Sequence, residues 1–169
     1  MPKNVALVGF MGAGKSVVAM YLASTLKREL ISTDALIVER EKRPITDIFR
    51  DSGEAYFREL EKKVVAEVNK QENLIIDCGG GIVLNRENID ALKKSGILIY
   101  LSATPKIIYE RIRNQKHRPL LNVPNPQAEI TELLESRKPL YNQADYKIDT
   151  SSKTVEEVAR EIIKILPHD

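Results

Sequence analysis

The chain has 169 residues, of which 43% are hydrophobic and 30% are charged, as in an ordinary globular domain. Its formal net charge of +2 is too small to indicate a nucleic acid or a membrane surface as a partner. The single cysteine, Cys78, excludes an internal disulfide and is compatible with a reducing cytoplasm. The sequence lacks any run of about 18 apolar residues, so we expect no membrane span.

Short apolar runs alternate with helical patterns along the chain. The predicted strands are at residues 5–8, 30–31, 74–76, 97–101 and 146–148. Helical patterns are predicted between and after them, over residues 15–27, 35–69, 86–94, 105–113, 127–141 and 155–166. Pro44 and Gly53 interrupt the longest of these segments. This alternation is typical of a parallel sheet with helices on both faces.

The sequence shows no internal repeat and no linker, so we predict one domain over residues 1–169. Two segments are expected to stand over the carboxyl edge of the sheet, where ligands bind in this architecture. One is the helical segment at about 35–62. The other, at about 112–126, is basic near its start and contains three prolines, a composition typical of a mobile loop.

Residues 9–16, Gly-Phe-Met-Gly-Ala-Gly-Lys-Ser, form a complete Walker A phosphate loop between a predicted strand and a predicted helix. Successive backbone N–H groups of such a loop surround phosphate oxygens, and the helix N-terminus adds partial positive charge. Lys15 is expected to reach the β- and γ-phosphates of ATP, and the Ser16 hydroxyl is expected to ligate Mg²⁺. The alternative is a plain glycine turn, which the full pattern and its context argue against. The predicted ATP contacts of this loop are Gly12, Ala13, Gly14, Lys15, Ser16 and Val17.

Five further motifs follow in order, and with the phosphate loop they resemble the shikimate kinase family over nearly the whole chain. They are Thr33-Asp34, residues 53–61, Gly79-Gly80-Gly81, residues 118–121 and residues 137–141. The resemblance implies a three-layer α/β/α P-loop kinase fold with a five-stranded parallel sheet, a substrate-binding helical insert and a mobile lid. It also implies transfer of a phosphoryl group from ATP to shikimate, which yields shikimate 3-phosphate.

Shikimate carries one carboxylate and three hydroxyls, so its site needs cationic forks and a carboxylate that binds a hydroxyl. The resemblance assigns Arg58 and Arg137 to the substrate carboxylate and Asp34 to the acceptor hydroxyl, where it can take the proton. It assigns the triple glycine, Gly79, Gly80 and Gly81, to close backbone contact with substrate. Each assignment has an alternative. Arg58 and Arg137 could be surface arginines paired with neighbouring glutamates, and Asp34 could cap the helix that starts at Ala35. The triple glycine could be a plain strand-to-helix turn.

On the nucleotide side, the resemblance assigns Arg111 to packing on the adenine and Arg118, in the lid, to the transferring phosphoryl group. Arg118 is thus the third predicted catalytic residue beside Lys15 and Asp34. Lys153, in the loop after the last strand, is expected to border the adenine. The alternatives are an exposed helix arginine for Arg111 and a solvated loop charge for Arg118.

The sequence departs from the family pattern at two strand ends. Many shikimate kinases carry Asp-x-Asp after the second strand, but here the first position is Ser32. Asp77 stands before the triple glycine, where the family usually has Ser or Thr. In the family's sheet order the third strand lies beside the phosphate-loop strand, which brings Asp77 near Ser16. We therefore predict that Asp77 takes the metal role that Ser32 cannot perform, the alternative being a turn cap.

The expected partners are ATP, Mg²⁺ and shikimate, without nucleic acid or membrane, and the expected state is a cytoplasmic monomer. A kinase for another small molecule, such as gluconate or a nucleoside monophosphate, is the first alternative. Gluconate also has a carboxylate and hydroxyls, so residue chemistry alone leaves it open. The second alternative is a nucleotide-binding module without catalysis. The missing carboxylate at Ser32 gives it slight support, but intact Lys15, Ser16, Asp34 and Arg118 argue against it.

Overall fold

The computed structural model describes residues 3–115 and 121–167 of the chain. Its five strands form one sheet in the order β2-β3-β1-β4-β5, and all four neighbouring pairs are parallel. In chain order the strands are β1 (Asn4–Val8), β2 (Glu29–Ser32), β3 (Leu74–Asp77), β4 (Gly96–Ser102) and β5 (Tyr146–Asp149). The predicted five-stranded parallel sheet is confirmed.

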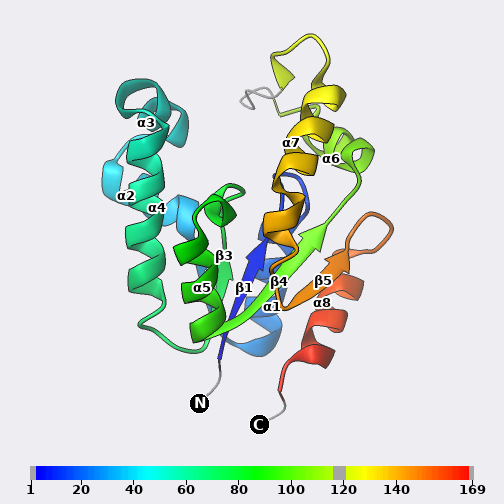
Figure 1. Ribbon diagram of the computed structural model, residues 1–169. Coiled ribbons are helices and arrows are strands. Elements are labelled where there is room, and N and C mark those ends of the chain that lie inside the picture. Colours follow the sequence, from blue (N-terminus) through cyan, green and yellow to red (C-terminus); the bar gives the residue numbers. More distant parts are fainter. Residues whose placement is uncertain (1–2, 116–120, 168–169) are drawn as a thin grey trace.

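Helices cover both faces of the sheet, which confirms the predicted three layers (Figure 1). They are α1 (Lys15–Leu26), α2 (Thr33–Glu41), α3 (Ile45–Ser52), α4 (Glu54–Val68), the short 3₁₀ helix η1 (Ile82–Leu84), α5 (Arg86–Ser95), α6 (Pro105–Ile112), α7 (Pro126–Tyr141) and α8 (Val155–Ile165). Alternate residues of β1 face opposite layers. Val5 and Leu7 pack in the core beneath α1 and α8, whereas Ala6 and Val8 belong to the core on the other face.

The central strand β1 carries the phosphate loop at its carboxyl end. All five of its residues are buried, and it pairs with β3 on one side and β4 on the other. A strand covered on both faces needs apolar residues at successive positions, which explains its continuous hydrophobic run. β2 and β5 form the edges, and Glu29 and Leu30 of β2 are exposed. The loop is therefore anchored in the middle of the sheet.

The predicted helical insert contains the three helices α2, α3 and α4. Gly53 (φ 86°, ψ 167°) lies between the end of α3 and the start of α4, and Pro44 precedes α3. These are the two breaks that the sequence indicates. Figure 1 shows α2 and α3 on one side above the carboxyl ends of the strands, with α6 and the start of α7 on the other. Of the predicted lid, residues 112–115 and 121–126 are described, and Arg118 lies outside the described residues.

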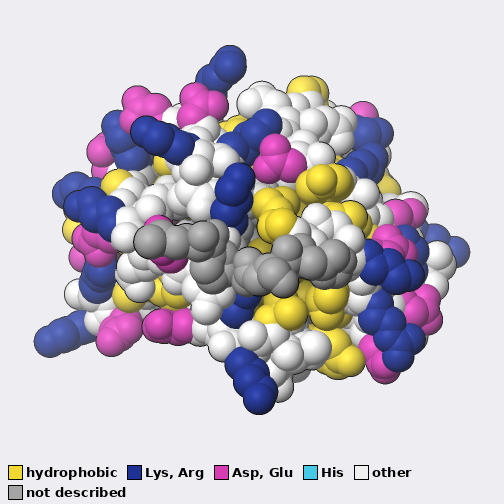
Figure 2. Space-filling model, turned by 90° about the horizontal axis from the view of Figure 1, so that it is seen from below, with side chains coloured by type: hydrophobic (Ala, Val, Ile, Leu, Met, Phe, Trp, Pro, Cys, Tyr) yellow, Lys and Arg dark blue, Asp and Glu magenta, His cyan; other side chains and the backbone are white. Residues whose placement is uncertain are grey.

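Among the described helices, none combines the length and the apolar character required to cross a membrane. Figure 2 views the molecule from the end where the strands begin. Apolar side chains gather near the middle of this view, and positive and negative side chains are mixed around them. The described side chains on this face therefore carry charges of both signs.

Candidate active site

The phosphate loop joins β1 directly to α1. Gly14 precedes the helix with φ 93°, in the left-handed region that glycine adopts most readily. The Lys15 side chain is buried and folds back across the loop, where its Nζ donates to the carbonyl oxygens of Gly9 (2.7 Å) and Phe10 (3.0 Å). The ammonium group and the N-terminus of α1 thus meet at one place, which favours an anion.

Ser16 and Asp77 meet beside this loop. The Ser16 hydroxyl donates to Asp77 Oδ2 at 2.7 Å. The sheet explains the contact, because β3 lies next to β1 and pairs Asp77 with Leu7. On the other side Asp77 pairs with Ser32 of β2, so the two positions where this chain departs from the family are neighbours. The structure thus places an anionic oxygen against the hydroxyl that is predicted to hold Mg²⁺.

Ser32, which occupies the position of a metal-binding aspartate in many shikimate kinases, caps a helix in this structure. Its hydroxyl accepts a hydrogen bond from the N–H of Ala35 (3.2 Å) and caps the N-terminus of α2. The alternative in which Asp34 caps this helix is therefore wrong, because Ser32 already occupies that position. Asp34 instead lies within the first turn of α2.

Asp34 lies against the first glycine of the triple. A methyl group built on Gly79 would be 2.5 Å from Asp34 Oδ1 and 3.2 Å from Glu61 Oε2. The neighbouring Thr33 accepts a hydrogen bond from the Gly79 N–H at 2.9 Å. Only glycine leaves room for these carboxylates at such short range, so the first glycine is explained by close approach.

Arg58 of α4 lies against the third glycine. A methyl group on Gly81 would be 2.4 Å from Arg58 Nη1. The guanidinium lies above the rings of Phe49 and Phe57, with its carbon 5.9 Å and 5.3 Å from their centroids. Its Nη1 donates to Glu61 Oε1 at 2.6 Å. Arg58 is therefore paired with a glutamate of its own helix, as the alternative reading of the sequence allowed. The pair lies inside the site instead of on the surface.

The partner of Arg58 is a buried carboxylate. Glu61 is 1% exposed, and desolvation raises its pKa, while the Arg58 guanidinium opposes that rise. The nearby charge of Asp34 adds a smaller upward contribution to the pKa of Glu61. Sequence reasoning considered Glu61 only as a surface partner of Arg58, since a glutamate three residues from an arginine on a helix usually forms an exposed pair.

Arg137 of α7 lies against the second glycine. Its guanidinium carbon is 5.7 Å from the centroid of the Phe10 ring, and a methyl group on Gly80 would be 4.0 Å from its Nη1. The same methyl would be 3.6 Å from the backbone nitrogen of Met11 in the phosphate loop. Gly80 thus lies between the backbone of Met11 and the Arg137 guanidinium.

Arg111 and Thr150 connect the phosphate loop to the loop after β5. Arg111 donates to Gly12 O (3.1 Å), Thr150 Oγ1 (3.1 Å) and Thr150 O (2.8 Å). The buried Thr150 hydroxyl also lies 2.9 Å from Ala13 O and 3.1 Å from Ser102 O. Arg111 is thus held in place instead of being a free helix arginine. Sequence reasoning missed Thr150 because its partner Ala13 is 137 residues away and no local pattern links them.

Two further residues, Lys153 and Val17, are predicted to contact the nucleotide. Lys153 follows β5 and forms an ion pair with Glu161 of α8 at 2.8 Å. The Val17 side chain, in the first turn of α1, is 52% exposed. Both remain predicted contacts of ATP.

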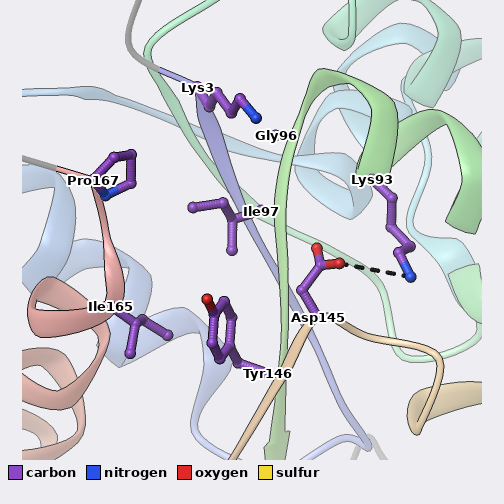
Figure 3. A pocket seen from close by; sticks show the side chains of 8 residues that line it. All are labelled: Lys3, Lys93, Gly96, Ile97, Asp145, Tyr146, Ile165 and Pro167. Atoms are coloured by element: carbon purple, nitrogen blue, oxygen red, sulfur yellow. Dashed lines mark ion pairs between the residues drawn. The ribbon is translucent and has the colours of Figure 1, made fainter.

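The opposite end of the sheet has an open hollow of its own, shown in Figure 3. It is lined by residues at the starts of β1, β4 and β5 and by the ends of α5 and α8, including an ion pair between Lys93 and Asp145 at 3.6 Å. Among the described residues predicted for ATP, Mg²⁺ or shikimate, none lines it. These residues therefore lie away from this hollow.

The geometry agrees with the relatives of the chain. A family model for shikimate kinase matches residues 11–167. A shikimate kinase from Caldanaerobacter subterraneus subsp. tengcongensis is 47% identical, over 96% of this chain and 95% of its own. Another, from Thermoanaerobacter pseudethanolicus, is 44% identical over the same shares of the two chains.

Solved structures give the same answer. Shikimate kinase from Acinetobacter baumannii, in complex with shikimate, is 36% identical with a TM-score of 0.92, over 98% of this chain and 93% of that chain. A gluconokinase from Sinorhizobium meliloti is 17% identical with a TM-score of 0.57, over 96% and 90%, and so shares only the fold. The motifs, the meeting of three side chains at the triple glycine and these relatives lead to one conclusion: the chain belongs to the shikimate kinase family.

Proposed function

We propose that this protein transfers the γ-phosphoryl group of ATP to the 3-hydroxyl of shikimate, as a cytoplasmic, Mg²⁺-dependent monomer. One observation carries the substrate assignment. Three consecutive glycines each lie against a different side chain expected for shikimate: Asp34 at Gly79, Arg137 at Gly80 and Arg58 at Gly81. This set combines two cations with one carboxylate, which complements an acid that also carries hydroxyls.

The substrate side divides the work between the arginines and Asp34. Arg58 and Arg137 come from α4 and α7 and can grip the carboxylate with planar pairs of N–H donors. Asp34 is a half-buried carboxylate that can orient the acceptor hydroxyl and take its proton as the new P–O bond forms. Phosphoryl transfer depends mainly on such positioning and on charge stabilisation.

The nucleotide side is arranged around Lys15. When ATP binds, Lys15 can exchange its bonds to the carbonyls of Gly9 and Phe10 for bonds to phosphate oxygens. Arg111, fixed by Gly12 and Thr150, presents its guanidinium beside the loop, where an adenine ring can pack. Arg118 stays a prediction, as does closure of the lid to exclude water.

The residues beside the loop fit a magnesium ion. Mg²⁺ in kinases usually takes one or two protein oxygens and completes its shell with phosphates and water. Ser16 and Asp77 supply such a pair, and the described residues contain no larger group of His, Cys, Asp and Glu able to hold a metal. Bound there, the ion would neutralise charge on the phosphates.

Asp77→Asn should raise the Mg²⁺ concentration needed for half-maximal turnover by about 10- to 100-fold, as is typical when a residue that supports a metal ion is lost. Ser32→Ala should change this requirement little and instead lower the melting temperature, because it removes the cap of α2. Asp149→Asn, at the end of β5, is the matched control. Calorimetry of Mg²⁺–ADP binding gives a second readout, and equal small effects of Asp77→Asn and Ser32→Ala would contradict the assignment.

The substrate is tested by coupled release of ADP with shikimate, with gluconate and without an acceptor. We expect turnover that depends on shikimate. Preference for gluconate would support the first alternative named above. Binding of ATP without release of ADP under any of the three conditions would support the second, a nucleotide-binding module.

A further inference from the structure

The last turn of α7 places Tyr141 beneath the triple glycine. Its hydroxyl donates to the carbonyl oxygen of Gly80 at 2.6 Å, although 61 residues separate the two in sequence. The side chain of Tyr141 is fully buried. This hydrogen bond ties the buried hydroxyl to the backbone of the triple glycine, where it can affect the position of groups that face the substrate.

The Tyr141 ring is held so that its hydroxyl stays on Gly80. It stacks on Tyr100 of β4, with centroids 4.9 Å apart and planes 14° from parallel. Burial raises the pKa of Tyr141, and the Arg137 guanidinium opposes this rise without cancelling it. The phenol therefore keeps its proton at neutral pH and acts as a donor.

The hydrogen bond also sets the direction of the next N–H group. All described peptide bonds are trans, so the carbonyl of Gly80 and the N–H of Gly81 point in opposite directions. Tyr141 holds that carbonyl on one side, which turns the Gly81 N–H to the other. Gly81 is buried, and within residues 3–115 and 121–167 its N–H has no acceptor. Buried N–H groups are rarely left without one.

We propose that Tyr141 is a positioning residue that orients the Gly80–Gly81 peptide so that its N–H can donate to shikimate. Arg137 lies one turn earlier on the same helix. One face of α7 thus supplies both the Arg137 guanidinium and the Tyr141 hydroxyl that holds the Gly80–Gly81 peptide. The substrate would then be bound by side-chain cations and by one oriented backbone donor. This inference rests on the proposed function and extends it to a residue that lies behind the site, next to Gly80 and Arg137.

Tyr141→Phe removes the hydroxyl and keeps the ring that stacks on Tyr100. We expect the KM for shikimate to rise about fivefold to tenfold, the net worth of one hydrogen bond. The KM for ATP should stay within about twofold, because the phosphate loop does not depend on this bond. The rise should be constant from about pH 6 to about pH 9, since the raised pKa keeps the phenol protonated over that range.

Two variants serve as controls. Tyr146→Phe changes an exposed tyrosine at the other end of the sheet, in the hollow of Figure 3. Tyr100→Phe preserves both the ring stack and the Tyr141 hydroxyl. Both should keep the KM for shikimate of the natural chain.

A lower melting temperature of Tyr141→Phe with an unchanged KM for shikimate would overturn the proposal, because a purely structural bond gives that result. If this variant does not fold, hydrogen exchange of the Gly81 amide in the natural chain gives the second test: slower exchange when shikimate is bound would support the proposal, and an unchanged rate would overturn it. Turnover by the natural chain distinguishes a failure of the proposed function from a failure of the positioning role of Tyr141. If it fails to phosphorylate shikimate, the proposed function fails, whereas normal turnover with an unaltered Tyr141→Phe enzyme refutes only the positioning role.

Discussion

Asp34→Asn is expected to lower kcat by about 10²- to 10⁴-fold, the usual contribution of a group that takes a proton in the transition state. The amide fits the same space beside Gly79 but cannot accept the proton of the acceptor hydroxyl. It can still donate or accept a hydrogen bond, so the KM for shikimate should change much less than kcat. Steady-state kinetics with shikimate varied at saturating ATP separates the two constants.

A matched control exists in the same helical insert. Asp47 lies in the first turn of α3, as Asp34 does in α2, but its partner is the exposed Arg50. Asp47→Asn should therefore keep full activity. If Asp34→Asn turned over as fast as this control, Asp34 would not act as a base, and the transition state would need positioning and charge alone.

Arg58→Ala is expected to raise the KM for shikimate strongly while leaving the KM for ATP almost unchanged. The pair that is lost is the one between the Arg58 guanidinium and the carboxylate of shikimate. Removing one member of a largely buried charge pair typically costs about 2–5 kcal/mol of binding free energy, or roughly thirtyfold to several thousandfold in kcat/KM. The variant also leaves Glu61 without its 2.6 Å partner, so the pKa of Glu61 should rise further and the protein should lose stability. Calorimetry with shikimate measures the binding loss directly.

Three related changes separate charge from geometry. Arg58→Lys keeps the charge but not the planar fork and should recover only part of the affinity. Gly81→Ala keeps the arginine but pushes its guanidinium away, since the added methyl would lie 2.4 Å from Nη1, and should also weaken shikimate binding. Arg50→Ala removes an exposed arginine of α3 and should have little effect. Normal shikimate affinity in Arg58→Ala would remove the basis for the substrate assignment.

The elements themselves could be predicted well from local signals. The apolar runs locate all five strands, and Pro44 and Gly53 mark the two breaks of the helical insert. The phosphate loop is equally local, because its function depends on consecutive residues between one strand and one helix. The neighbouring positions of Asp77 and Ser16 required the strand order of the family, since periodicity alone does not determine which strands are adjacent.

The supports of the site could not be predicted, because they join distant residues without a local pattern. Thr150 reaches Ala13, and Tyr141 reaches Gly80, across long stretches of chain. The sequence left open whether Asp34 caps α2, and it gave no indication that Ser32 is the residue that does so. The backbone contact of the triple glycine with substrate stays a prediction, and only packing shows that its first and third positions exclude a side chain.

The guanidinium of Arg58 rests partly on Phe49, which belongs to α3, whereas the phosphate loop extends from the buried strand β1. These two supports belong to regions of unequal resistance to opening. Amide hydrogens of β1 should exchange with solvent only when the whole molecule unfolds, and those of α3 should exchange through smaller, more frequent fluctuations. Mild denaturant should therefore abolish recognition of the acid before it releases the nucleotide.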